Sequence, residues 1–212
     1  MTENIDDMIE YDLRDRGVTD ARVLDAFRKV DRKKFVPEMS LKHAYDDRAL
    51  NLSHGQTLSQ PYIVGLMTQA LQLCGAERVL EIGTGSGFQT AILSVLACEV
   101  FSVERVEFLA TTAEDRLLAL GLKNIRYHLG DGSLGWPEHA PFERIVITAA
   151  CPVVPAALKE QLAEGGKLVA PVGDAAEQEL LVLTRQNGKF VEHNLGPCVF
   201  VKLIGAQGFT NY

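Results

Sequence analysis

Apolar side chains recur along this chain at two spacings, and the order of the two predicts an α/β fold. Over residues 5–13 and 19–30 they recur every three or four positions, which predicts two amphipathic helices. From residue 61 on, helical spacing alternates with short, nearly continuous apolar runs that are typical of buried strands. The predicted strands cover residues 78–82, 99–104, 125–129, 144–147, 167–173, 179–184, 190–193 and 198–204. The predicted helices between them cover residues 61–73, 109–120 and 156–162, and a further helix begins near residue 88.

The connections predict how these strands are arranged. Strands that alternate with helices form parallel sheets, and the apolar run at 78–82 places that strand in the centre, covered on both faces. Asn187-Gly188 is a two-residue hairpin signal, so the last strands are expected to be antiparallel. The charged and aromatic segment 31–45 is expected to be irregular. We therefore predict a mostly parallel, doubly wound sheet with antiparallel C-terminal strands and an N-terminal helical appendage.

Length and composition indicate a single domain over residues 1–212, with helices and a loop in 1–60 and a ligand-binding core in 61–212. A chain of 212 residues with 47% hydrophobic content can form one well-buried core and is too short for two ordinary domains. The net charge of −7 does not indicate affinity for nucleic acid or an anionic membrane. The one basic run, residues 28–34, is interpreted as a solvated helix end and loop.

The cysteines and the N-terminus indicate where the protein works. The four cysteines are far apart and form no C-x-x-C pair, so we expect reduced thiols with neither a zinc site nor a disulfide framework. The N-terminus has no signal-peptide pattern, and no run of about 18 apolar residues occurs. A cytoplasmic protein without a membrane partner is therefore expected.

Three glycines at positions 83, 85 and 87 follow the 78–82 strand and mark a ligand site. Without a Cβ the backbone can adopt positive φ and let a ligand approach, while the amides of the next helix point outward. The dinucleotide fingerprint has its third glycine one residue later, and a phosphate loop needs Gly-Lys-Ser/Thr. Glu81 suits a cationic ligand, and the motif resembles the first motif of Rossmann-like S-adenosylmethionine methyltransferases. A glycine turn formed for purely steric reasons is the alternative.

Small hydroxyl and amide side chains gather just before the helix predicted at residue 61. The stretch is His54-Gly55-Gln56-Thr57-Leu58-Ser59-Gln60-Pro61-Tyr62-Ile63-Val64. On position alone, helix capping explains Ser59 as well as an active site does. With the glycine motif about twenty residues later, and with Arg22-Val23-Leu24 and Phe35-Val36-Pro37 before it, the stretch resembles the protein-L-isoaspartate O-methyltransferase family. The resemblance covers most of the chain and favours Ser59 as an active-site residue.

This resemblance implies an activity, a cofactor and a set of site residues. The activity is transfer of a methyl group from S-adenosyl-L-methionine to the free carboxylate of L-isoaspartyl residues in damaged proteins and peptides, with S-adenosyl-L-homocysteine as product. A Rossmann-like S-adenosylmethionine-dependent methyltransferase fold, a monomer and a catalytic Ser59 are also implied. The expected cofactor contacts are Gln56, Thr57, Leu58, Ser59, Glu81, Gly83, Thr84, Gly85, Gly87, Glu104, Asp131 and Gly132. The expected substrate contacts are Thr57, Ser59, Thr148, Ala149, Ala150, Phe200 and Val201.

Two of the expected cofactor contacts can also be judged by their position. Glu104 ends the 99–104 strand about twenty residues after Gly83, where a carboxylate can accept hydrogen bonds from both ribose hydroxyls. This position indicates a nucleoside without choosing between nicotinamide and methionine-derived cofactors. The resemblance makes Asp131 the acceptor for an adenine amino group, whereas in isolation an Asp-Gly turn explains Asp131-Gly132 better.

The residues after the 144–147 strand narrow the chemistry. Thr148-Ala149-Ala150 contains neither the Asn/Asp-Pro-Pro-aromatic motif of enzymes that methylate planar amino groups nor the acidic cluster of metal-dependent catechol-type enzymes. Base methylation is therefore disfavoured and no metal is expected. The uncrowded backbone suits an extended peptide. One departure from the family is Lys202, which follows Phe200-Val201 where the family usually has proline.

The implied reaction requires positioning more than proton transfer. A carboxylate with a pKa of about 4 is already ionised at neutral pH, so no general base is needed. Ser59, with Thr57 nearby, would orient that carboxylate in a water-poor site. Two other functions are open: a catalytically silent cofactor-binding or interaction module on the same fold, and an NAD-dependent oxidoreductase. The short glycine spacing disfavours the second of these.

Overall fold

A seven-stranded sheet forms the centre of the molecule in the computed structural model, which describes residues 4–52 and 55–210. Its strands are β3 (Arg78–Ile82), β4 (Glu99–Glu104), β5 (Ile125–Leu129), β6 (Phe142–Ile147), β7 (Leu162–Gly173), β8 (Gln178–Gln186) and β9 (Lys189–Cys198). The strand order is β5-β4-β3-β6-β7-β8-β9. The first five strands in this order are parallel, and β8 and β9 are antiparallel, so the predicted sheet is confirmed.

Successive side chains of a strand point to opposite faces, so the sheet has apolar side chains on both faces, and helices cover them. Val79 packs into an apolar cluster with the helices of one face, and Leu80 and Ile82 pack into a second cluster on the other face. The helices are α2 (Ala21–Lys29), α3 (Pro61–Leu71), α4 (Phe88–Leu96), α5 (Glu107–Ala119) and α6 (Ala156–Gln161). Helices α2 to α5 contribute to the first cluster, and α6 contributes Leu158 to the second.

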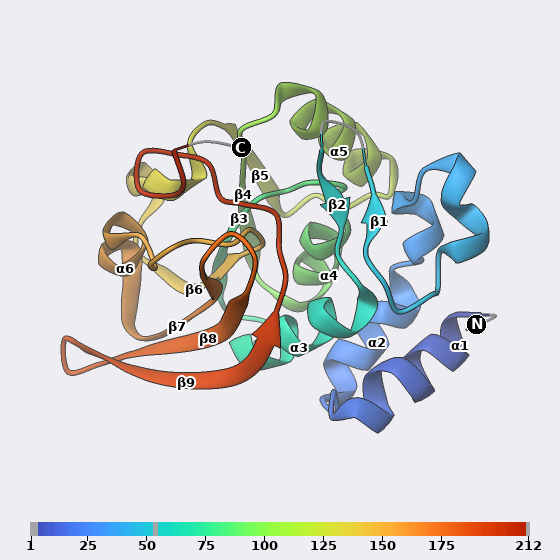
Figure 1. Ribbon diagram of the computed structural model, residues 1–212, viewed down its shortest axis with the longest axis horizontal. Helices are drawn as coiled ribbons and strands as arrows, with labels where there is room; N and C mark the ends of the chain where they lie inside the picture. Colours follow the sequence, from blue (N-terminus) through green and yellow to red (C-terminus); the bar gives the residue numbers. More distant parts are fainter. Residues whose placement is uncertain (1–3, 53–54, 211–212) are drawn as a thin grey trace.

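The N-terminal part packs against α3 and α4. Its first helix begins as α1 (Ile5–Asp7), continues as a π-helix (Met8–Leu13) and ends as a 3-10 turn (Arg14–Arg16) at Gly17, whose φ is +97°. The side chain of Asp20 then caps α2 by accepting a hydrogen bond from the Arg22 amide. Figure 1 shows these blue helices on one side of the molecule and the long β8–β9 hairpin on the other.

The segment 31–45 is more regular than its sequence predicts. It contains two 3-10 helices, Arg32–Phe35 and Glu38–His43. The Asp31 side chain accepts a hydrogen bond from the Lys33 amide and so starts the first of them, and the second begins after Pro37, a residue whose fixed φ suits a first turn. The chain then forms a short antiparallel pair, β1 (Leu50–Asn51) and β2 (Thr57–Leu58), which leads into α3.

The strand predicted at 198–204 is wrong, whereas the strand predicted at 190–193 extends further than expected, to Cys198. After β9 the chain leaves the sheet edge and turns back over the end of β6. There the Ala150 amide donates to the Val201 carbonyl and the Leu203 amide donates to the Ala150 carbonyl, both at 2.7 Å. This isolated bridge places residues 200–204 at the carboxyl edge of the sheet, where the glycine turn also lies.

Candidate active site

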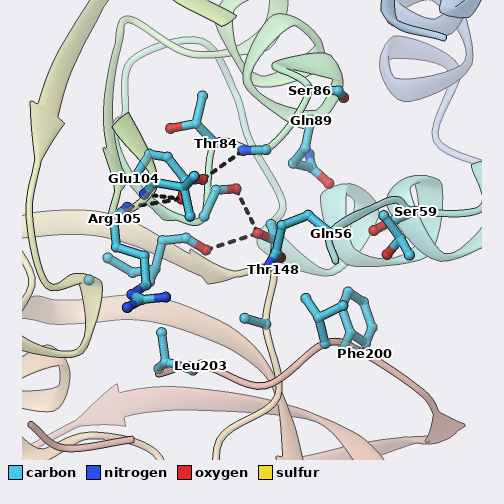
Figure 2. Close-up of a pocket in the computed structure, with 18 of the residues that line it drawn as sticks. Gln56, Ser59, Thr84, Ser86, Gln89, Glu104, Arg105, Thr148, Phe200 and Leu203 are labelled. Carbon is cyan, nitrogen blue, oxygen red and sulfur yellow. Dashed lines mark hydrogen bonds between the residues drawn. The ribbon is translucent and has the colours of Figure 1, made fainter. Parts of the chain in front are cut away.

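A cavity lies at the carboxyl ends of β3, β4 and β6, the edge at which open α/β sheets bind their ligands. It contains about 890 Å³ of free space, part of which is open to solvent. Its lining includes parts of the chain that are distant in sequence: the 56–59 stretch, the glycine turn with the end of β4, Thr148-Ala149 after β6, and residues 200–204. Figure 2 shows Glu104 and Ser59 on opposite sides of this space.

The glycine turn has positive φ at all three glycines, with values of +97° at Gly83, +56° at Gly85 and +86° at Gly87. A Cβ at Gly83 would lie 2.4 Å from the Thr148 hydroxyl, so this position is required for packing. A Cβ at Gly85 would have no neighbour within 4 Å, because this part of the turn faces the cavity. The steric explanation therefore accounts for Gly83, while Gly85 leaves room for a ligand.

Glu104 at the tip of β4 is fixed by backbone amides and lines the cavity. One carboxylate oxygen accepts from the Gly85 amide at 2.9 Å, and the other accepts from the amides of Arg105 and Val106 at 2.9 and 3.0 Å. The bond from the Gly85 amide joins the end of β4 directly to the glycine turn. Glu104 therefore lies beside the glycine turn, and its contact with a ribose remains a prediction.

Glu81 lies behind the turn instead of in the cavity. Its side chain is fully buried on the α4 face, where one oxygen accepts hydrogen bonds from Thr90 and Ser102, both at 2.6 Å. The other oxygen has no partner among the described residues. Burial raises the pKa of Glu81 to about 8, and the nearby Glu104 charge adds to the rise. The Glu81 carboxylate thus connects β3 to α4 and β4, and its expected contact with the cofactor remains a prediction.

Asp131 also has a structural role that accounts for its position. Its carboxylate accepts from the amide and hydroxyl of Ser133, at 2.9 and 2.7 Å, and from the Ala206 amide at 2.7 Å. Gly132, but not Asp131, lines the cavity. The bond from the Ser133 amide is the local turn that Asp131-Gly132 suggests, and the bond from Ala206 joins this loop to the C-terminal segment. An adenine contact remains a prediction.

Ser59 does not cap α3. The capping position is taken by Gln60, whose side chain makes no capping bond, and the Tyr62 amide donates to Asp47 at 2.8 Å. The alternative interpretation of Ser59 is therefore wrong, and Asp47 is the residue that satisfies the helix end. The side chain of Ser59 instead lines the cavity with its neighbours Gln56, Thr57 and Leu58. His54, which belongs to the matching motif, lies outside the described residues.

A buried arginine holds the loop that carries Ser59. The guanidinium of Arg32 donates to the carbonyls of Ser59 at 2.7 Å, Ala44 at 2.9 Å and Arg48 at 3.4 Å. Its side chain is fully buried, which lowers the pKa of Arg32 to about 9, although the Asp47 charge opposes this. Arg32 is buried, so the interpretation of the basic run 28–34 as solvated is wrong for this residue. The run contains five basic side chains, and nothing in the local sequence indicates which of them is buried.

The backbone after β6 is less open than predicted. The Thr148 hydroxyl lies 2.7 Å from the Gly83 carbonyl and 2.9 Å from the Ile82 carbonyl, so it supports the glycine turn while lining the cavity with Ala149. Ala150 is fully buried, and both its amide and its carbonyl are bonded to residues 201–203. An extended peptide therefore cannot pair at Ala150. Phe200, Val201 and Lys202 line the cavity from the same segment.

Gln89 is a cavity residue that sequence reasoning missed. It is 8% exposed and donates to Thr68 at 3.0 Å, but its side-chain oxygen has no partner among the described residues. A buried acceptor without a donor costs free energy unless a ligand or water satisfies it. Gln89 lies in the first turn of α4, directly after the glycine turn, and this position is the feature of the sequence that indicates a cavity residue. Together, the Gln89 oxygen, the Glu104 carboxylate and the open space at Gly85 fit a nucleoside ligand that carries an ammonium or other cationic group.

No cluster of three or more His, Cys, Asp or Glu side chains that could hold a metal ion occurs within residues 4–52 and 55–210. All four cysteines are free thiols. In the described part of the chain, no helix is both long and apolar enough to cross a membrane.

Comparison with known proteins gives one consistent result. The family model described as protein-L-isoaspartate(D-aspartate) O-methyltransferase matches residues 3–208. A protein-L-isoaspartate O-methyltransferase of Dictyoglomus thermophilum is 49% identical over 199 residues, which are 94% of this chain and 90% of that relative. Protein-L-isoaspartate O-methyltransferase 1 of Syntrophobacter fumaroxidans is 51% identical over 205 residues, 96% of this chain and 95% of that relative.

Solved structures agree with the sequence comparison. A protein-L-isoaspartate O-methyltransferase superposes with a TM-score of 0.87 and 27% identity, covering 97% of this chain and 67% of the other. A protein-L-isoaspartate O-methyltransferase of Plasmodium falciparum, solved with S-adenosyl-L-homocysteine, superposes with a TM-score of 0.82 and 25% identity. The superposition covers 95% of this chain and 98% of the other. The Rossmann-like methyltransferase fold expected from the sequence is confirmed.

Proposed function

Because the chain belongs to the protein-L-isoaspartate(D-aspartate) O-methyltransferase family, we propose that its cavity holds an L-isoaspartyl carboxylate beside a methyl donor bound along the glycine turn. The chain is an S-adenosylmethionine-dependent methyltransferase that acts on L-isoaspartyl residues in protein repair. When bound, S-adenosylmethionine supplies an electrophilic methyl group on a positively charged sulfur. The observation that carries the proposal is that Ser59, Gly85 and Glu104 line one cavity.

The donor would be bound by groups that the fold holds in place before it arrives. Glu104, fixed by three backbone amides, would accept hydrogen bonds from ribose hydroxyls. The unpartnered oxygen of Gln89 would accept from the ammonium of the methionine part. Gly83, Gly85 and the backbone near Gly132 would let the nucleoside lie close to the chain. These contacts orient the cofactor and leave the cavity side of Ser59 for the substrate.

The substrate carboxylate would be oriented by the hydroxyls of Ser59 and Thr57. It is ionised at neutral pH, so the chain has to aim one oxygen at the methyl group without removing a proton. Thr148, Ala149, Phe200 and Val201 would form the surrounding wall and exclude water. Reaction of an anion with a cation neutralises charge, so a water-poor and rigid site lowers the barrier mainly by alignment.

Methyl transfer to a matched pair of peptides tests this function. One synthetic peptide contains L-isoaspartate, and its twin contains normal aspartate at the same place. With radiolabelled S-adenosylmethionine, we expect labelled methyl ester on the first peptide only. Cofactor binding without labelling of either peptide would instead indicate the catalytically silent module.

We also propose that the protein is a cytoplasmic monomer that acts without nucleic acid or membrane partners. The free cysteines suit a reducing compartment, and the net charge of −7 opposes binding to polyanions. The edge strand β9 exposes Lys189, Glu192 and His193, and charged side chains on an edge discourage pairing between sheets. Light scattering after gel filtration should give a mass near 23.3 kDa, and a value near twice that would contradict the monomer.

A further inference from the structure

A second cavity opens on the other side of Ser59. It shares Thr57, Ser59 and Phe200 with the cofactor cavity, so the two spaces meet at the residue that would orient the acceptor carboxylate. Its remaining wall is formed by Arg16, Ala49, Gln60, Tyr62, Ile63, Pro197, Cys198 and Val199. If the donor occupies the first space, the second is an adjoining space that the peptide next to the isoaspartyl residue can occupy.

The second cavity carries one charge, and it is positive. Arg16 is the sole charged side chain among the described residues that line it. Burial raises the pKa of the Cys198 thiol to about 11, and the Glu179 charge adds to the rise, so this thiol is neutral at pH 7. The apolar part of the wall includes Pro197 and Val199, a residue that is 75% exposed. An anionic group of a bound peptide would therefore meet Arg16 without meeting a carboxylate of the cavity wall.

Arg16 is held in place by its neighbours. Its guanidinium carbon lies 3.6 Å from the centre of the Tyr62 ring, and one of its nitrogens donates to Asp47. Gln69 of α3 fixes the turn that follows Arg16, because its side chain donates to the Gly17 carbonyl and accepts from the amides of Thr19 and Asp20. A stacked guanidinium on a fixed turn loses little conformational freedom when it binds an anion.

Asp47 does not cancel the charge of Arg16 completely. Its carboxylate is shared between Arg16, the Gln60 amide group at 3.0 Å and the Tyr62 backbone amide at 2.8 Å. The Arg16 side chain is 43% exposed, and a guanidinium has five N–H donors, so others can reach a ligand. The net charge of −7 gives no long-range attraction for acidic peptides, and any preference for them has to arise from local contact.

We propose that the second cavity binds the peptide chain next to the isoaspartyl residue, and that Arg16 favours substrates with an acidic side chain there. This inference rests on the proposed function and adds a substrate preference to it. Exposed charge pairs typically change an equilibrium constant about two- to fivefold. We therefore expect a KM about two- to fivefold lower for a peptide with Glu in the contacting position than for its Gln twin, with kcat similar for both.

The test uses peptides in which Glu or Gln occupies each of the two positions before and after the isoaspartyl residue. For each pair, the ratio of KM values is measured with the unaltered protein, with Arg16→Gln and with Arg14→Gln. Arg14 belongs to the same 3-10 turn, pairs with Glu10 at the surface and does not line the cavity, which makes Arg14→Gln the matched control. The preference should appear at one or more positions, disappear in Arg16→Gln and persist in Arg14→Gln.

Each KM ratio compares two peptides with the same protein variant. A general loss of activity therefore does not by itself remove the preference for Glu. If Arg16→Gln has no activity at all, Arg16→Lys decides: the inference requires that this charge-preserving variant keeps a preference for Glu. Equal KM values for every Glu and Gln pair in the unaltered protein would overturn the inference, as would a preference that survives in Arg16→Gln. Failure of the proposed function would look different, because no isoaspartyl peptide would then be methylated.

Discussion

Ser59 shows how a single side chain acquires a role once its structural alternative is removed. Asp47 accepts the hydrogen bond from the Tyr62 amide at the start of α3, and Arg32 donates to the Ser59 carbonyl. The Ser59 hydroxyl therefore does not cap the helix. It lines both the cofactor cavity and the neighbouring cavity. A hydroxyl in this position can donate to a carboxylate that occupies the space between them.

We predict that Ser59→Ala lowers kcat by roughly 10² to 10³, since removal of one orienting donor in an active site has an effect of this size. The affinity for S-adenosylmethionine should change little, because Glu104 and the glycine turn are untouched. Single-turnover methylation of an isoaspartyl peptide measures the rate, and calorimetry measures the affinity. A variant with full activity would remove Ser59 from the mechanism, and a variant that has lost cofactor affinity would place its role elsewhere.

The residues around Ser59 also show what sequence can and cannot reveal about a site. Gly83, Gly85, Glu104 and the 56–59 stretch line the cavity, and each belongs to a local sequence pattern with a physical meaning, whereas Gly87 of the same glycine pattern does not line it. Arg32 was missed because its burial depends on carbonyls from residues 44, 48 and 59, which only the fold brings together. Glu81 does not line the cavity, and its alternation along β3 places it on the same face as Val79, which packs against α4.

At the scale of elements, the strands were easier to predict than the segment that completes the site. Strands β3, β4, β6 and β7 contain buried apolar runs, and the bounds predicted for β3 to β8 lie within about five residues of those observed. Residues 199–204, which follow the end of β9, have the same apolar character but form only isolated bridges to Ala150 and Phe209. Periodicity reports that a segment is buried; it does not report which partner covers it, and here the partner is the end of β6.

The glycine turn between β3 and α4 gives a prediction with a matched control. Gly85 and Gly121 both have positive φ, +56° and +77°, and a Cβ at either would meet nothing within 4 Å. Gly85→Ala and Gly121→Ala should therefore each lose about 1 kcal/mol of stability, the cost of a side chain in this conformation. Only Gly85 lines the cavity, and only Gly85→Ala should weaken S-adenosylmethionine binding, by tenfold or more.

Thermal unfolding and equilibrium cofactor binding of the two variants separate the two effects. Equal losses of affinity would mean that backbone strain alone weakens binding. Unchanged affinity in Gly85→Ala would mean that the cofactor does not approach the turn at this residue, and the steric interpretation would then apply to all three glycines.

At the scale of the whole molecule, the buried carboxyl of Glu81 connects stability to pH. Glu81, Ser102 and Tyr127 are neighbours across β3, β4 and β5 on the face that α4 and α5 cover. The Glu81 oxygen without a partner and the Tyr127 hydroxyl, also without one, are both buried among the described residues. The charged groups that act on this row are Glu104, beside the turn, and Glu114 of α5. Both of these charges are acidic and oppose ionisation of Glu81, whereas the hydrogen bonds from Ser102 and Thr90 favour it and are outweighed by burial.

The sign of the resulting pH dependence follows from proton binding. In the unfolded chain Glu81 titrates near its ordinary pKa of 4.5, and in the folded protein burial raises the pKa to about 8. Between these values the folded state binds the extra proton, so the contribution to stability is complete below about pH 4.5 and is lost as the pH rises to about 8. Above that range the carboxyl is ionised in both states, and the protein has to keep a buried charge.

We predict that Glu81→Gln removes this part of the pH dependence, because the amide is neutral at every pH and its oxygen can still accept from Thr90 and Ser102. Between pH 6 and pH 8.5 the melting temperature of the unaltered protein should fall by at least roughly 5 °C more than that of the variant. Glu192→Gln, an exposed substitution on β9 with the same change in charge, is the control and should follow the unaltered protein. Parallel melting curves for all three proteins would mean that Glu81 is already ionised in the fold, and the hydroxyls of Thr90 and Ser102 would then be sufficient to hold its charge below the glycine turn.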